Sequence, residues 1–132
     1  MKHVLFLDGT KTKFSWIIQT GDQIKKEFRV HPPAYYSGYK LEVKNDEQSK
    51  FIALHVGLYW GIGVFIIKEG DMVDVMCDSK KMYDILNSKH KTSDQIISDK
   101  INFINLFIEQ RKLIVNYHLI GDDDNPASEL IR

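Results

Sequence analysis

The chain has 132 residues, of which 43% are hydrophobic and 27% are charged. This composition is typical of one globular domain and excludes an intrinsically disordered chain. Eighteen basic and eighteen acidic side chains give a formal net charge of zero, which excludes a general electrostatic attraction to nucleic acid. A single cysteine, Cys77, excludes an internal disulfide, and no signal segment opens the chain, so we expect a cytoplasmic protein.

The first thirty residues predict three strands that form an antiparallel meander. Each run is apolar or alternating, and short polar turns separate the runs. Pro32-Pro33 ends the third run, because proline cannot donate to a sheet ladder. The predicted strands are residues 3–7, 14–19 and 23–30.

Helices and strands alternate in the rest of the chain. A helix is expected from Asn45-Asp46-Glu47, with acidic residues in its first turn and Gly70 as its terminator. Residues 51–67 contain no Asp, Glu, Lys or Arg, but their short length and three glycines favour a buried helix over a membrane span. The later predicted elements are a strand at 72–77, helices at 79–88 and 92–110, a strand at 113–120, and a short helix after Asn125-Pro126.

This order of elements predicts one α/β domain over residues 1–132. Its core is a five-stranded mixed sheet flanked by helices. The fourth and fifth strands follow helical crossovers, so we expect both to run parallel to the first strand.

Asp8 and Asp78 stand at the carboxyl ends of two predicted strands, where ligand chemistry gathers in open α/β sheets. Two interpretations of Asp78 are open. It caps the following helix, as Asp or Ser does in that position, or it binds a metal together with Asp8. If the two strands are neighbours, the carboxylates repel each other until a proton or a cation relieves the repulsion. Oxygen ligands favour Mg²⁺ or Mn²⁺.

Four segments, in order along nearly the whole chain, resemble the type 1 ribonuclease H family, especially its short bacterial members. They are similar to the family's first strand with its Asp-Gly, its central helix, its strand ending in Asp-Ser, and its last strand, loop and helix. The segments read LFLDGT, KFIALHVGL, VDVMCDS and VNYHLIGDDDNPASELI. The resemblance implies a ribonuclease H-like fold and a four-carboxylate site that uses Mg²⁺ or Mn²⁺ to cleave the RNA strand of an RNA–DNA hybrid.

Two of the four carboxylates implied by the resemblance are replaced. Asp8 and Asp78 match the family's catalytic and metal-binding positions. Lys50 stands where the family has Glu, and Ser128 stands where it has Asp. We expect the Lys50 ammonium to pair with Asp8 or Asp78, metal binding to be weak, and hybrid cleavage to be small or absent.

The resemblance also implies where nucleic acid binds. The expected contacts are Gly9, Thr10 and Asn45, and we expect binding to be weak and salt-dependent because phosphate contacts dominate it. Rings in the loop before the first helix are candidates for stacking on bases, although packing is the commoner role of loop tyrosines. These rings are Tyr35, Tyr36 and Tyr39.

Two other functions stay open at this point. In the first, Glu47 or the loop Asp122–Asp124 replaces a missing carboxylate ligand of the metal, and the chain is an active metal-dependent endoribonuclease. Alternatively, the chain is a protein-interaction or regulatory scaffold that binds no nucleic acid.

Overall fold

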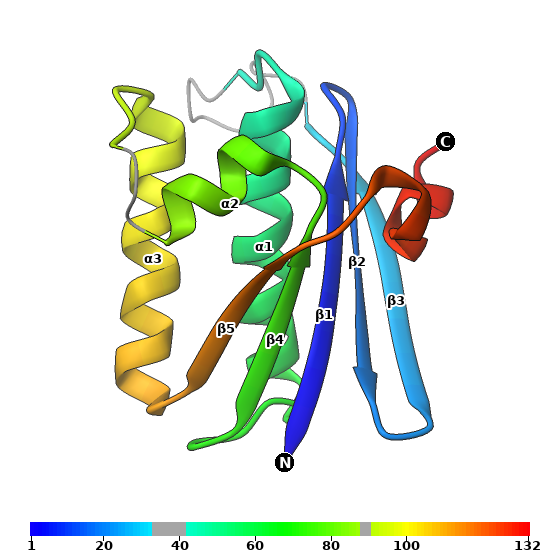
Figure 1. The fold of residues 1–132 in the computed structure, drawn as a ribbon, viewed down its shortest axis with the longest axis vertical. Coiled ribbons are helices and arrows are strands. Elements are labelled where there is room, and N and C mark those ends of the chain that lie inside the picture. Colours follow the sequence, from blue (N-terminus) through cyan, green and yellow to red (C-terminus); the bar gives the residue numbers. More distant parts are fainter. Residues whose placement is uncertain (33–41, 88–90) are drawn as a thin grey trace.

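The computed structural model describes residues 1–32, 42–87 and 91–132, so the three loop tyrosines predicted to stack on bases lie outside the described residues. Within the described residues, a five-stranded sheet has the order β3-β2-β1-β4-β5 (Figure 1). The strands are β1 Lys2–Gly9, β2 Lys13–Thr20, β3 Gln23–Val30, β4 Met72–Cys77 and β5 Ile114–Leu119. β1 to β3 are antiparallel, whereas β4 and β5 run parallel to β1, which confirms the predicted mixed sheet.

In the described part of the chain, three α-helices contact the sheet or one another: α1 Asp46–Gly63, α2 Lys80–Leu86 and α3 Gln95–Arg111. α1 packs on β1 and β2, and α3 runs alongside α1 (Figure 1). Alternation along the strands sends one set of apolar side chains to the α1 side. That core includes Leu5, Leu7, Trp16, Ile18, Val73 and Val75 from the strands and Phe51, Leu54 and Leu58 from α1. No helix in the described residues is long and apolar enough to cross a membrane.

α1 begins as predicted but ends earlier than predicted. The Asn45 side chain accepts a 2.9 Å hydrogen bond from the Gln48 amide and caps the helix. The helix ends at Gly63, so the prediction of Gly70 as its terminator is wrong. Phe65 takes the left-handed conformation that usually requires glycine, with φ of 65°, and the chain turns there.

The helix predicted after Asn125-Pro126 is a short 3-10 helix, and another 3-10 turn lies in the loop before it. Residues Asp122–Asp124 and Pro126–Leu130 form the 3-10 helices η1 and η2, and Asn125 caps η2 by accepting a 3.1 Å hydrogen bond from the Ala127 amide. η2 packs against β1, β2 and β3 (Figure 1). The hydroxyl of Ser15 in β2 donates a 2.7 Å hydrogen bond to the Ala127 carbonyl. This contact holds η2 beside the carboxyl end of β1.

Candidate functional site

Asp8 and Asp78 lie side by side at the carboxyl ends of two parallel strands. Phe6 of β1 pairs with Met76 of β4, and each aspartate comes two residues after its member of that pair. Their side chains are only 6% and 1% exposed. Two neighbouring carboxylates that are removed from water need a compensating positive charge.

Lys50 supplies that charge from the second turn of α1. Its Nζ atom lies 2.8 Å from Asp78 Oδ1 and 3.7 Å from Asp8 Oδ1. The approach depends on Gly9, because a Cβ atom there would lie 2.6 Å from the carbonyl carbon of Ser49 and 2.7 Å from the amide nitrogen of Lys50. The predicted pairing of the lysine with the two aspartates is confirmed, and close contact between β1 and α1 makes it possible.

The lysine is held in its charged form. Burial on its own would lower the pKa of Lys50. The hydrogen bond and the charge of Asp78 raise the pKa, and the charges of Asp8 and Glu47 raise it further. Together they outweigh burial, so the pKa of Lys50 is raised. An ammonium with a raised pKa does not act as a general base near neutral pH.

Each of the four carboxylate oxygens has a donor from within the chain. Asp8 Oδ1 accepts from the Gly9 amide at 2.8 Å, and Asp8 Oδ2 accepts from the Ser128 hydroxyl at 2.7 Å. Asp78 Oδ1 accepts from Lys50, and Asp78 Oδ2 accepts from the Asn125 side-chain amide at 2.9 Å. The two residues that replace carboxylates in the resemblance, Lys50 and Ser128, are therefore both hydrogen-bond donors to the remaining pair.

The helix cap that follows β4 is Ser79 and not Asp78. The Ser79 hydroxyl accepts a 3.1 Å hydrogen bond from the Met82 amide and donates a 2.6 Å hydrogen bond to Glu47. This arrangement leaves the carboxylate of Asp78 for Lys50 and Asn125. The interpretation of Asp78 as a plain cap is wrong because the serine one position later has the better reach to the helix amides.

These residues do not fit a divalent cation. The ammonium of Lys50 lies against both carboxylates, and their oxygens already accept internal hydrogen bonds. In the part of the chain that the structure describes, no group of three or more His, Cys, Asp and Glu side chains is arranged to hold a metal ion. Glu47 is bound by Ser79, and the loop Asp122–Asp124 is exposed to solvent.

Asn125 is the site residue that sequence reasoning missed. Its position before proline marked it as a cap, and that role uses only its side-chain oxygen. The side-chain nitrogen donates to Asp78 at 2.9 Å and to the Leu7 carbonyl at 2.8 Å. Nothing in the local sequence signals this second role, because it depends on where η2 lies relative to the strand ends.

No protein-family model matches the chain, and no curated protein sequence matches it significantly. Solved structures do match. RNase H1 from the halophilic archaeon Halobacterium salinarum is 14% identical, with a TM-score of 0.76 over 98% of this chain and 94% of that chain. The N-terminal RNase H domain of Rv2228c from Mycobacterium tuberculosis is 14% identical, with a TM-score of 0.77 over 98% and 95%.

A third solved structure is LC11-RNase H1 in complex with an RNA/DNA hybrid. It is 13% identical to this chain, with a TM-score of 0.68 over 97% of this chain and 92% of that chain. Identities this low establish shared architecture and not shared chemistry. The chain therefore has the ribonuclease H-like fold that its sequence predicted.

Proposed function

We propose that this chain binds RNA–DNA hybrids on its ribonuclease H-like scaffold and cleaves them little or not at all. The observation that carries the proposal is the Lys50 ammonium, 2.8 Å from Asp78 and 3.7 Å from Asp8. The fold supports the binding half, because LC11-RNase H1, which shares it, was solved in complex with an RNA/DNA hybrid. Cys77 is a free, buried thiol, which is compatible with the cytoplasmic location that we assume.

We expect little or no cleavage because the Lys50 ammonium cannot do the chemical work of a bound divalent cation. It offsets part of the negative charge of the two aspartates, but unlike a bound divalent cation it has no open coordination position for a water molecule or a phosphate oxygen. With its pKa raised, Lys50 does not take a proton from water near neutral pH either. The site thus holds one positive charge beside the two aspartates without supplying a nucleophile.

The proposed hybrid contacts surround the β1–β2 turn and the start of α1. Thr10 organises the turn, because its hydroxyl accepts a 3.2 Å hydrogen bond from the Lys13 amide. Gly9 is buried against α1, so its proposed role is to hold the turn in place. Asn45 and Lys11 are exposed on this rim and supply polar and cationic contacts to phosphates.

A labelled RNA–DNA hybrid titrated in the absence of divalent cations tests the binding half by fluorescence anisotropy. We expect measurable binding at about 50 mM salt that falls steeply by about 200 mM, because phosphate contacts dominate. Lys11→Glu should weaken binding, whereas Lys112→Glu, at the end of α3, is the matched control and should not. No binding at low salt, or binding unaffected by Lys11→Glu and by salt, contradicts the proposal and favours a scaffold without nucleic acid.

One observation favours an active metal-dependent endoribonuclease instead. Glu47 lies close enough to Lys50 to raise its pKa, and its Oε2 atom is buried without a hydrogen-bond partner in the described residues. A third carboxylate therefore stands beside the ammonium. Divalent-dependent cleavage that Glu47→Gln abolishes would establish this alternative, whereas a wild-type chain without such cleavage would remove it.

A further inference from the structure

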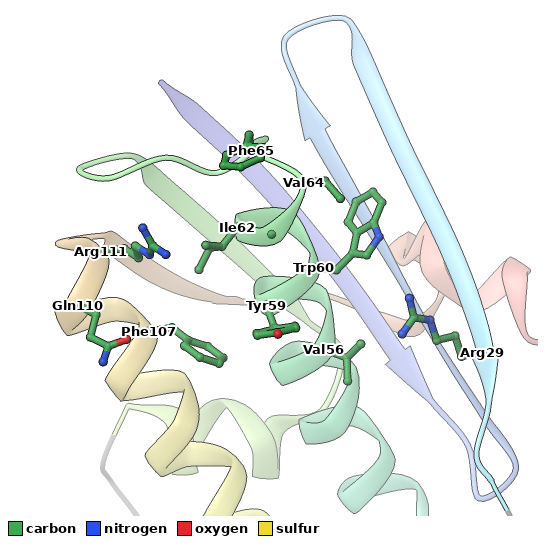
Figure 2. A pocket seen from close by; sticks show the side chains of 11 residues that line it. Arg29, Val56, Tyr59, Trp60, Ile62, Val64, Phe65, Phe107, Gln110 and Arg111 are labelled. Atoms are coloured by element: carbon green, nitrogen blue, oxygen red, sulfur yellow. The ribbon is translucent and has the colours of Figure 1, made fainter.

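A cavity lies beside the carboxyl-terminal half of α1. Gly63 comes thirteen positions after Lys50 in α1, which corresponds to about 20 Å along the helix axis. The cavity has a volume of about 530 Å³ and is lined by α1, the turn after it, α3 and Arg29 of β3. In Figure 2, Arg29 and Arg111 stand on opposite sides of this groove, and apolar side chains of α1 and Phe107 of α3 lie between them.

The groove exposes apolar side chains to solvent. One of them, that of Phe65, belongs to a residue with an unfavourable backbone conformation. Phe65 is 78% exposed, and Tyr59 and Val64 are 63% and 44% exposed. Phe65 also has φ of 65°, a left-handed conformation that is rare for a bulky residue. Exposed apolar clusters and residues with a strained backbone both mark interaction sites. A bound partner removes the apolar surface from water, and its contacts offset the free-energy cost of the strained backbone.

The aromatic rings of the groove favour apolar side chains over nucleobases as its occupant. Tyr59 already packs against Phe107, with centroids 5.7 Å apart, and Trp60 packs against Trp16 at 5.9 Å. Stacking of bases requires free ring faces and a track of cations. Here the Tyr59 and Trp60 rings contact other rings, the lining that the structure describes carries two separated arginines and no track of cations, and aliphatic carbons of α1 such as Ile62 line the rest of the groove.

The charges of the groove point to carboxylates on the occupant. Its charged lining residues are Arg29 and Arg111. Arg29 lies over the Trp16 ring, 5.1 Å from the centroid, and its ion pair with Glu27 is 3.3 Å long and about half exposed. Arginine binds carboxylates in a bidentate geometry, and such contacts are common at protein interfaces.

We propose that this groove docks a segment of a partner protein whose apolar side chains are flanked by carboxylates. The apolar side chains fill the space beside Tyr59 and Phe65, and the carboxylates pair with Arg29 and Arg111. The α1 residues that the occupant contacts lie in the carboxyl-terminal half of the helix, whereas Lys50 lies in its second turn.

A phage-displayed random peptide library, selected on the full chain, tests this proposal. The enriched peptides should combine aromatic or aliphatic residues with Asp or Glu, and synthetic copies should bind in solution. Phe65→Gly removes the side chain and suits the left-handed backbone, so this variant should fold and yet bind at least about tenfold more weakly. Arg111→Glu should shift the selection toward basic peptides. Leu119→Ser, an exposed apolar change on β5, is the matched control and should bind normally.

Three results would overturn the proposal. The first is a selection that yields no enriched peptide, or only peptides without acidic residues. The second is affinity that both Phe65→Gly and Arg111→Glu leave unchanged. The third is a different occupant: a single-stranded oligonucleotide that binds the wild type and not Phe65→Gly, or a dimer of this chain in sedimentation that Phe65→Gly dissociates.

Discussion

The Nζ atom of Lys50 lies 2.8 Å from Oδ1 of Asp78, and the two side chains are only 15% and 1% exposed. Another ion pair of the chain, Lys112 with Glu69, is 3.6 Å long, and its two side chains are 78% and 63% exposed. The two lysine–carboxylate pairs therefore lie in very different environments. A buried pair that loses one partner leaves an uncompensated charge, whereas an exposed pair leaves a group that water solvates.

Lys50→Ala should lower the free energy of unfolding by about 3–5 kcal/mol, because it leaves two buried carboxylates without their cation. Lys112→Ala, which breaks the exposed pair with Glu69, is the matched control and should cost about 1 kcal/mol or less. Urea unfolding of both variants measures the difference. Equal losses in the two variants would show that the ammonium of Lys50 is not what balances the aspartates.

The double change Lys50→Glu with Ser128→Asp should create a divalent-cation site, because it removes the ammonium and places four carboxylates around the strand ends. We expect the melting temperature of this variant to rise with added Mg²⁺ and some hybrid cleavage to appear. Each single change should do less than half as much, since the ligands of one metal site act as a unit. A folded double variant without any response to Mg²⁺ would contradict the proposed geometry.

Gly9→Ala should destabilise the chain by about 1–3 kcal/mol, because the new methyl group meets backbone atoms of Ser49 and Lys50 that cannot move independently of α1. Gly63→Ala is the matched control. Nothing lies within 4 Å of a Cβ atom at that helical position, so this change should be neutral or stabilising by up to about 1 kcal/mol. Chemical denaturation of both variants checks this, and a Gly9→Ala chain as stable as the wild type would refute the close contact.

Asp71 should make stability depend on acid pH. Burial on its own would raise its pKa, but hydrogen bonds from His3, from the Lys68 amide and from the N-terminal ammonium outweigh burial and lower the pKa to about 2. Since the unfolded value is near 3.8, this stabilisation is complete above about pH 4 and is lost as the pH falls through about 2.

Urea unfolding of wild type and Asp71→Asn across this range measures the effect. The variant should be less stable at about pH 5, and the difference between the two chains should shrink toward pH 2. The geometry behind this expectation is the 2.7 Å hydrogen bond between His3 Nε2 and Asp71 Oδ2. A difference that stays constant from pH 5 to pH 2 would mean that Asp71 is not held in this way.

The strand order and the lysine–aspartate pair were predictable because their signals are local or come from the resemblance. Alternating apolar runs and polar turns marked all five strands, and the helical crossovers fixed their directions. Lys50 was predictable as the partner of Asp78 because the resemblance placed it opposite two aligned aspartates. Cys77, in the strand predicted at 72–77, is fully buried.

The end of α1 was not predictable, because its turn breaks the usual rule. Helices commonly end with glycine in the left-handed position, and Gly70 fits that pattern in the sequence. The structure places Phe65 there, and the amides of Ile66 and Ile67 both donate to the Gly61 carbonyl at 3.0 Å. Ile67 then turns into the core, so the apolar pattern continues beyond the helix.

The role of Asn125 was hidden for a different reason. It depends on η2 lying over the end of β1, and no periodicity along the chain reports that contact. The cap on α2 was also ambiguous, since Asp78 and Ser79 are both good capping residues. Only the three-dimensional position of Lys50 separates their roles.

The most direct test of the central claim is a cleavage assay on a labelled RNA–DNA hybrid with Mg²⁺ and, separately, with Mn²⁺. Wild-type protein should retain the hybrid in a binding assay and leave its RNA strand intact, because Lys50 occupies the space between Asp8 and Asp78. Asp78→Asn serves as the control for contaminating nuclease. Robust divalent-dependent cleavage by the wild type that disappears in Asp78→Asn would contradict the account.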